Sequence, residues 1–298
     1  GGLRSPIGVL NGQYKHMRPE ILGSQVIDEI INRYTISHID GIFCGNAVGT
    51  GGNLGRLMGL MCNLPNSVPA ITVDMQCASA LMSIEIAYAH IVSGIMDSAI
   101  AGGIESSSLQ PERVYASGDD REGPYKVAQF TPQDQSPLAM LKGAERTIHK
   151  YNVTKEDLYP HIIGSHQRAS AALDNPYLQS YIMPITIDGK RCIDECIRPT
   201  MNEKLLSRMK PLLGADSITN AGNACLTHDG AAFVYLSNKK GPFKIHSVKP
   251  WAGNPQFSPE GALESTEAIL KRTGLTMDDI DVVEWNEAFA IKIGRAHV

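Results

Sequence analysis

Cys77 is the residue of this 298-residue chain whose position best suits it to covalent chemistry. It follows the apolar run 70–73, which has the composition of a buried strand, and it opens a stretch with helical periodicity. A thiol at the start of a helix lies near free backbone N–H groups and the positive end of the helix dipole, which stabilise a thiolate. The sequence therefore offers Cys77 as a nucleophile, with an ordinary buried cysteine as the alternative.

A second candidate is Asn286, which opens the segment Asn286-Glu287-Ala288-Phe289-Ala290. The apolar residues 282–285 follow an Asp-rich turn and predict a strand there, with a helix beginning after it. An Asn amide at this point can hold a water molecule or a carbonyl oxygen, and it can equally cap the helix. From position alone both roles stay open.

The elements that must position these residues follow an α/β pattern. Strands are predicted at 42–44, 70–73 and 97–103, and helices at 26–31 and from about Cys77 to Gly94. Strand, helix, strand indicates a parallel crossover. The polar, Pro-rich residues 109–224 predict a helix-rich insertion, after which strands at 231–236 and 243–248 and a helix at 263–275 resume the pattern. The predicted core face of the helix after Cys77 consists of Leu81, Ile84, Tyr88, Ile91 and Ile95.

Composition narrows the class of protein. The chain has 27 Lys and Arg against 31 Asp and Glu, and the net charge of −4 excludes the strongly basic surface typical of nucleic-acid binding. No apolar run approaches the roughly 18 residues that suggest a membrane span, and the start of the chain lacks a secretory pattern. Six cysteines without framework spacing indicate reduced thiols, and Cys192 and Cys196 lack further ligands for a metal. We expect a cytoplasmic protein without a metal site.

Eight short segments in a fixed order carry a family resemblance. They are Arg4-Ser5-Pro6-Ile7-Gly8, Gly45-Asn46, Gln76-Cys77-Ala78-Ser79-Ala80, Gly102-Gly103-Ile104-Glu105-Ser106, Met140 with Ala144-Glu145, Ser165-His166-Gln167-Arg168, Ala221-Gly222-Asn223-Ala224, and Asn286 to Ala290. In this order they resemble the motifs of the thiolases, the acyl-CoA C-acyltransferases, over nearly all of residues 1–292. Ala78 and Ala80 replace two glycines of the family, so we expect extra methyl groups beside the nucleophile.

The resemblance implies an α/β thiolase fold, in which two duplicated mixed-sheet halves form a layered αβαβα arrangement with an inserted helical loop domain. It assigns residues 1–110 to the first part of the N-terminal half and 111–225 to the inserted loop domain, which binds coenzyme A. Residues 226–240 would be the return strand of the N-terminal half. Residues 241–292 would begin an incomplete C-terminal half. Independently of the family, residues 293–298 resemble the conceptual translation of a sequencing adapter, so we expect them to be a non-native tail.

The resemblance also implies the reaction and its residues. Cys77 would carry the acyl group as a thioester and help form the oxyanion hole through its N–H, while Asn286 would hold a catalytic water. The expected contacts with coenzyme A are Met140, Arg198, Ala221, Cys225 and Phe289. Acyl-CoA and coenzyme A would be substrates, with no tightly bound cofactor and no metal. A homodimer or tetramer, in fatty acid metabolism such as β-oxidation, is the family expectation.

Two catalytic residues of the family have no counterpart in residues 1–292, namely the His of Gly-His-Pro and the second Cys of Cys-x-Gly. We therefore expect the chain to be C-terminally truncated and inactive on its own. Two alternatives remain, a non-catalytic acyl-CoA-binding homologue and a decarboxylating ketoacyl synthase. The complete segment from Asn286 to Ala290 argues against the synthase.

Overall fold

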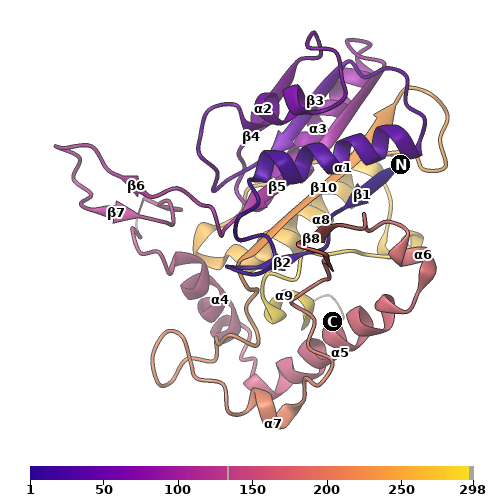
Figure 1. Ribbon diagram of the computed structural model, residues 1–298. Helices are drawn as coiled ribbons and strands as arrows, with labels where there is room; N and C mark the ends of the chain where they lie inside the picture. The colour runs from indigo at the N-terminus through magenta and orange to yellow at the C-terminus, as the bar shows by residue number, and fades with distance from the viewer. Residues whose placement is uncertain (133, 295–298) are drawn as a thin grey trace. The chain divides into compact units, whose positions relative to one another are not determined.

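The computed structural model describes residues 1–132 and 134–294, so most of the predicted non-native tail, residues 295–298, lies outside it. The chain forms two compact units, which are shown in Figure 1. The first unit contains Gly1–Pro111, Leu173–Cys196 and Thr227–His246. The second contains Glu112–Ala172, Ile197–Leu226 and Ser247–Val298. The predicted boundaries at 110, 225, 240 and 292 describe the domains expected from the family resemblance. They stay a prediction.

A mixed sheet is the centre of the first unit. Its strand order is β1-β10-β5-β3-β4, and β2 also pairs with β10. Strand β3 runs parallel to both β4 and β5, whereas β10 runs antiparallel to β5, which confirms the predicted parallel crossover. The strands are β1 (Gly2–Arg4), β2 (Gly8–Val9), β3 (Gly41–Gly45), β4 (Ala70–Val73), β5 (Ser98–Ser106) and β10 (His228–Ser237).

Helices cover both faces of this sheet. Helices α1 (Pro19–Arg33) and α2 (Leu54–Met61) pack on one face, and α3 (Ser79–Val92) packs on the other. Successive side chains of a strand point to opposite faces, and the core follows this rule. Ile42 of β3 belongs to the core beneath α1 and α2, whereas its neighbour Phe43 belongs to the core beneath α3.

The predicted core face of α3 is wrong at both of its ends. Leu81 is 69% exposed, and Ile95, just past the helix, is also 69% exposed. The buried residues of α3 are instead the small ones, Ser79, Ser83 and Ala87, at a spacing of four. Small residues let the helix approach the sheet closely, and that close packing outweighs the preference of the larger side chains for burial.

Residues 173–196 complete the first unit with helix α6 (Pro176–Gln179) and the hairpin of β8 (Thr186–Ile187) and β9 (Lys190–Arg191). The Arg4 guanidinium makes two hydrogen bonds of 2.8 Å to the Asp194 carboxylate, which also accepts the Ile7 N–H. Burial alone would raise the pKa of Asp194, but these bonds lower it. The start of the chain and this late segment are therefore held together by a charged pair.

The second unit is mainly helical. Its core combines residues of α4 and α5 with Leu206 of α7 and Phe289 and Ile291 near the end of the described chain. Its elements are the hairpin of β6 (Arg113–Val114) and β7 (Pro124–Tyr125), the helices α4 (Ala139–Lys150), α5 (Lys155–Leu173), α7 (Glu203–Leu206), α8 (Gly261–Thr273) and α9 (Ala290–Gly294), and the short 3-10 helices η1 (Pro255–Glu260) and η2 (Met277–Asp279).

Two predicted strands are absent. Residues 243–248 and 282–285 form no strand, although the helix predicted at 263–275 is present as α8. An apolar run becomes a strand only when its N–H and C=O groups find a neighbouring strand, and neither run pairs with one among the described residues. Phe243 is consequently 84% exposed. Within the described residues, no helix is both long and apolar enough to cross a bilayer.

Candidate active site

Cys77 is an exposed free thiol in the first unit. It lies in the turn that joins β4 to α3, whose first helical residue is Ser79 and whose N-cap is Ala78. Cys77 therefore precedes the helix, rather than lying on its first turn as the sequence led us to expect. The thiol still stands at the N-terminal end of α3, near the free backbone N–H groups of its first turn.

Glycines of the sheet determine how closely α3 approaches this turn. A Cβ atom on Gly45 would lie 2.5 Å from the Ala80 nitrogen, and a Cβ atom on Gly103 would lie 3.0 Å from the Ala80 Cβ. The methyl group of Ala80 thus packs toward the sheet. Glycine at both positions lets the first turn of α3 rest directly on the strands.

The loop after β3 is held by Glu105, a half-buried residue of a second motif. The carboxylate of Glu105 on β5 accepts the N–H groups of Ala47 (2.9 Å) and Val48 (3.1 Å) and the side-chain amide of Asn46 (2.7 Å). Burial raises the pKa of Glu105, because it outweighs these hydrogen bonds. The Gly-Asn and Gly-Gly-x-Glu-Ser segments are therefore two halves of one contact.

Three of the predicted coenzyme A contacts come together in the second unit. The Cys225 N–H donates to the Ala288 carbonyl (2.8 Å), and the Ala290 N–H donates to the Asn223 carbonyl (2.9 Å). This short antiparallel pairing places Phe289, which is 7% exposed, opposite Ala224. Met140 of α4 packs against the same core cluster as Phe289. Ala221 is exposed at the start of the same loop.

Glu145 of α4 supports this loop, a role that the sequence motif did not reveal. Its carboxylate accepts the N–H groups of Ile218 and Thr219, both at 2.8 Å, and the Thr219 hydroxyl at 2.5 Å. Burial would raise the pKa of Glu145, but the hydrogen bonds lower it overall. Glu145 and Ile218 are 73 positions apart, so the sequence around either gives no local signal for the contact and only the fold reveals it.

Asn286 is exposed in a segment without helix or strand, and its carbonyl accepts the Ala288 N–H at 2.9 Å. The predicted helix start at Asn286 is wrong, because α9 begins four residues later. The neighbouring Glu287 carboxylate accepts the Ser165 hydroxyl and lies 3.5 Å from Arg168. The Asn-Glu-Ala-Phe-Ala motif therefore contacts the Ser-His-x-Arg motif through Glu287, which meets Ser165 and Arg168.

Arg198 is exposed, and its backbone N–H donates to Nδ1 of His166 at 3.2 Å. Burial, with the positive charge of Arg198, lowers the pKa of His166. A neutral imidazole can accept that N–H, whereas a protonated one cannot. Of the seven predicted site residues, Cys77 thus belongs to the first unit, and Arg198 and the other five belong to the second.

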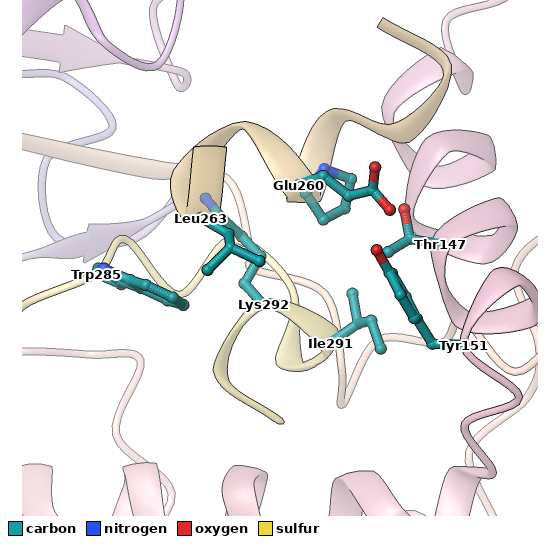
Figure 2. Close-up of a pocket in the computed structure, with 8 residues that line it drawn as sticks. Thr147, Tyr151, Glu260, Leu263, Trp285, Ile291 and Lys292 are labelled. Atoms are coloured by element: carbon teal, nitrogen blue, oxygen red, sulfur yellow. The ribbon is translucent and has the colours of Figure 1, made fainter. Parts of the chain in front are cut away.

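A small, partly open hollow lies in the second unit, and Figure 2 shows the residues around it. It is lined by Thr147, Tyr151, Pro259, Glu260, Leu263, Trp285, Ile291 and Lys292. None of the predicted site residues lines it, although Ile291 of its lining belongs to the same core cluster as Phe289. No group of three or more His, Cys, Asp or Glu side chains suited to a metal ion occurs in the part of the chain that the structure describes.

Comparison with known proteins adds the family. Residues 1–240 match the family model of the thiolase N-terminal domain. This chain belongs to the thiolase family. A Staphylococcus epidermidis protein, provisionally named acetyl-CoA C-acetyltransferase VraB, is 32% identical over 97% of this chain and 79% of its own length. The Staphylococcus aureus protein of the same name is 31% identical over 97% of this chain and 80% of its own length.

A solved structure extends the comparison to the fold. The Bacillus anthracis acetyl-CoA acetyltransferase superposes with a TM-score of 0.86 over 98% of this chain and 80% of that structure, at 24% identity. The chain therefore has the thiolase fold of the α/β class, as the motifs implied. For a thiolase, the position of Cys77 after a strand and before a helix is the feature of greatest chemical interest.

Proposed function

We propose that this thiolase is an acyl-CoA C-acyltransferase that makes or cleaves 3-ketoacyl-CoA through a covalent acyl-Cys77 thioester. The observation that carries the proposal is the exposed Cys77 thiol at the junction of β4 and α3 in a chain of this family. The names of the staphylococcal relatives, which designate acetyl transfer, support the same class of reaction.

The covalent step needs only the thiol and an acyl-CoA. The Cys77 thiolate attacks the thioester carbonyl, a new C–S bond forms, and the bond to the coenzyme A sulfur breaks. The departing coenzyme A thiolate takes up a proton in place of the one that Cys77 lost. A second acetyl-CoA then loses an α-proton to a base, a role that would fall to the second Cys of Cys-x-Gly, which has no counterpart in residues 1–292. The α-carbon of this acetyl-CoA attacks the acyl group, a C–C bond forms, and Cys77 leaves as a thiolate. Asn286 would hold the water that polarises the thioester oxygen of that second acetyl-CoA.

Coenzyme A and acyl-CoA are the proposed substrates, bound reversibly without a resident cofactor. The apolar cluster of Met140 and Phe289 suits the pantetheine or acyl chain, and the exposed Ala221 and Cys225 lie on the adjoining loop. Arg198 is an exposed cation suited to a nucleotide phosphate. A homodimer or tetramer in the cytoplasm, acting in fatty acid metabolism, completes the proposal.

The test is acetyl transfer to Cys77 in the full-length protein. The unmodified protein, incubated with acetyl-CoA and quenched in acid, should show one acetyl group on the peptide that contains Cys77. Cys77→Ser should abolish that adduct and reduce thiolysis of acetoacetyl-CoA by at least about 10⁴-fold. Cys196→Ser, which removes a partly exposed thiol elsewhere in the first unit, is the matched control and should keep both.

A non-catalytic acyl-CoA-binding protein would give a different result. Such a protein would bind acetyl-CoA equally well before and after the Cys77→Ser substitution, and it would form no adduct in either form. That outcome would reject the covalent mechanism and leave only the fold in common with the enzymes of the family.

A further inference from the structure

The turn that presents Cys77 contains a residue in an uncommon backbone conformation. Gln76, immediately before the thiol, has φ of 51°, in the left-handed region that glycine adopts readily and other residues rarely do. A non-glycine residue held there costs about 1 kcal/mol or more unless the surroundings compensate. The contacts that compensate are therefore the ones that fix the direction of the thiol.

Ser79 makes two of these contacts. Its hydroxyl oxygen accepts the Met75 N–H at 2.8 Å, and the same hydroxyl donates to the Gln76 carbonyl at 2.6 Å. The Ser79 side chain therefore bridges the two residues that precede Cys77 in the chain. Ser79 is only 5% exposed, so water does not compete effectively for either bond.

Asp74 adds a contact from the solvent side of the turn, and the Ser79 main-chain N–H also donates to the Gln76 carbonyl at 3.0 Å. Its Oδ1 accepts the Gln76 N–H at 2.8 Å. Both the N–H and the carbonyl of Gln76 are thus held by side chains, one from Asp74 and one from Ser79. An exposed aspartate and a buried serine together keep the backbone of Gln76 in its left-handed conformation.

We propose that Ser79 and Asp74 are positioning residues for acyl transfer, because they lock the Gln76 turn that directs the Cys77 sulfur and its backbone N–H toward the acyl carbonyl. This inference rests on the proposed function. Neither side chain touches the substrate in this account. A shift of about 1 Å in the position of a reacting atom can slow a reaction about 100-fold, so loss of the Ser79 bridge should slow acyl transfer about 10- to 100-fold.

The experiment measures single-turnover acetylation of Cys77 by acetyl-CoA in the full-length protein. Ser79→Ala should lower the maximal acetylation rate about 10- to 100-fold while the half-saturating acetyl-CoA concentration changes less than about threefold. Asp74→Ala removes the bond to the Gln76 N–H and a longer contact of 3.5 Å to the Gln76 side-chain amide, both at an exposed residue, and should lower the rate about 3- to 10-fold. Alkylation of Cys77 by iodoacetamide, which needs no aligned carbonyl site, should change less than about threefold in either variant.

Ser83→Ala is the matched control. Ser83 is another buried serine of α3, one turn further from Cys77, and its hydroxyl bonds to the Gly102 N–H (2.9 Å) and carbonyl (2.8 Å). This variant loses a comparable pair of bonds away from the turn. It should lower the melting temperature as much as Ser79→Ala does and leave the acetylation rate within about twofold.

The outcomes separate the two proposals. An unmodified protein that forms no acetyl-Cys77 overturns the proposed function, and the roles of Ser79 and Asp74 with it. An unmodified protein that is acetylated, together with a Ser79→Ala variant that is acetylated equally fast, overturns the positioning role alone. The same conclusion follows if Ser79→Ala and Ser83→Ala slow acetylation equally, or if alkylation slows in parallel with acetylation. If Ser79→Ala does not fold, Asp74→Ala alone decides.

Discussion

Substituting the glycines beneath α3 should test whether close backbone packing positions the Cys77 turn. A Cβ atom on Gly45 would lie 2.5 Å from the main-chain nitrogen of Ala80 and 2.5 Å from the carbonyl carbon of Ser79. Main-chain atoms cannot rotate away, so strand or helix must shift. Overpacking of this kind costs about 1–3 kcal/mol, and we place Gly45→Ala near the upper end of that range. The smaller unfolded-state entropy of alanine returns about 0.4–1 kcal/mol, which leaves a net loss of about 2 kcal/mol.

Substitution of Gly103 is a useful comparison, because half of its steric conflict is with a side chain rather than with the main chain. The nearest atoms to its added Cβ would be the Ala80 Cβ and the Gly45 carbonyl oxygen, both at 3.0 Å. Gly103→Ala should therefore cost about 1 kcal/mol. Ala80→Gly removes one of its two close contacts, so it should recover roughly half of that loss in the double variant. It should recover almost none of the loss in Gly45→Ala, whose conflict is with main chain.

The assay is urea unfolding of the single and double variants. Far-UV circular dichroism reports the helices of both units, whereas tryptophan fluorescence reports the second unit alone, because Trp251 and Trp285 both belong to it. The part of the circular dichroism change that does not coincide with the fluorescence change should move to lower urea, further for Gly45→Ala than for Gly103→Ala, while the fluorescence midpoint stays unchanged. Equal rescue of both glycine variants by Ala80→Gly would show that side-chain crowding, not main-chain approach, limits the packing.

Two further predictions concern the charged pair and the second core. Asp194→Asn should destabilise the protein by about 2 kcal/mol at pH 7, because Arg4 loses its carboxylate partner. The pKa of Asp194 is lowered in the folded state, so the ionised carboxylate contributes stability above the unfolded pKa of about 4 and loses it at lower pH. The difference between wild type and variant in urea unfolding should therefore shrink below about pH 4, and a constant difference would refute the ion-pair account. Phe289→Ala, at a position 7% exposed, should cost about 3 kcal/mol or more and lower the tryptophan fluorescence midpoint, and an unchanged midpoint would exclude Phe289 from the core.

Local patterns predicted the first unit well. Strands β3, β4 and β5 and helix α3 lie close to their predicted positions, because a buried parallel strand is a continuous apolar run. The predicted end of β5 at Gly103 is three residues early, because the strand continues through Gly102 and Gly103 to Ser106. The face of α3 was predicted incorrectly at its ends because hydrophobic periodicity assumes that the largest side chains face the core. Here the glycines of the sheet let α3 approach so closely that only small side chains fit between helix and sheet. Ser83 is therefore buried, whereas Leu81 is exposed. A pattern within one element does not report the surface of its partner.

Local sequence patterns could not predict contacts between distant residues, nor which apolar runs would lack a neighbouring strand. Arg4 and Asp194 are separated by 190 positions, and neither residue has a neighbour in sequence that indicates the other. The runs 243–248 and 282–285 have the composition of strands, yet a strand also requires a hydrogen-bonding neighbour. The candidate site divides in the same way. The position of Cys77 was predictable from its own surroundings, whereas the hydrogen bonds from Ile218 and Thr219, just before the 221–225 loop, to Glu145 were not.

The Gly-Asn, Cys and Gly-Gly motifs of the first unit are separate in the sequence but adjacent in the sheet. They meet at a row of three paired residues, one on each of β4, β3 and β5. In the sheet register Gly45 of β3 pairs with Val73 of β4 on one side and with Gly103 of β5 on the other. The turn to Cys77 leaves β4 immediately after Val73, and the two glycines allow α3 to lie against the same row. The Gly-Asn, Cys and Gly-Gly segments therefore occur together because each supplies part of a single close contact between three parallel strands and one helix end. A larger residue at either glycine of that row would move the thiol, which gives these glycines a chemical role although they carry no reactive group.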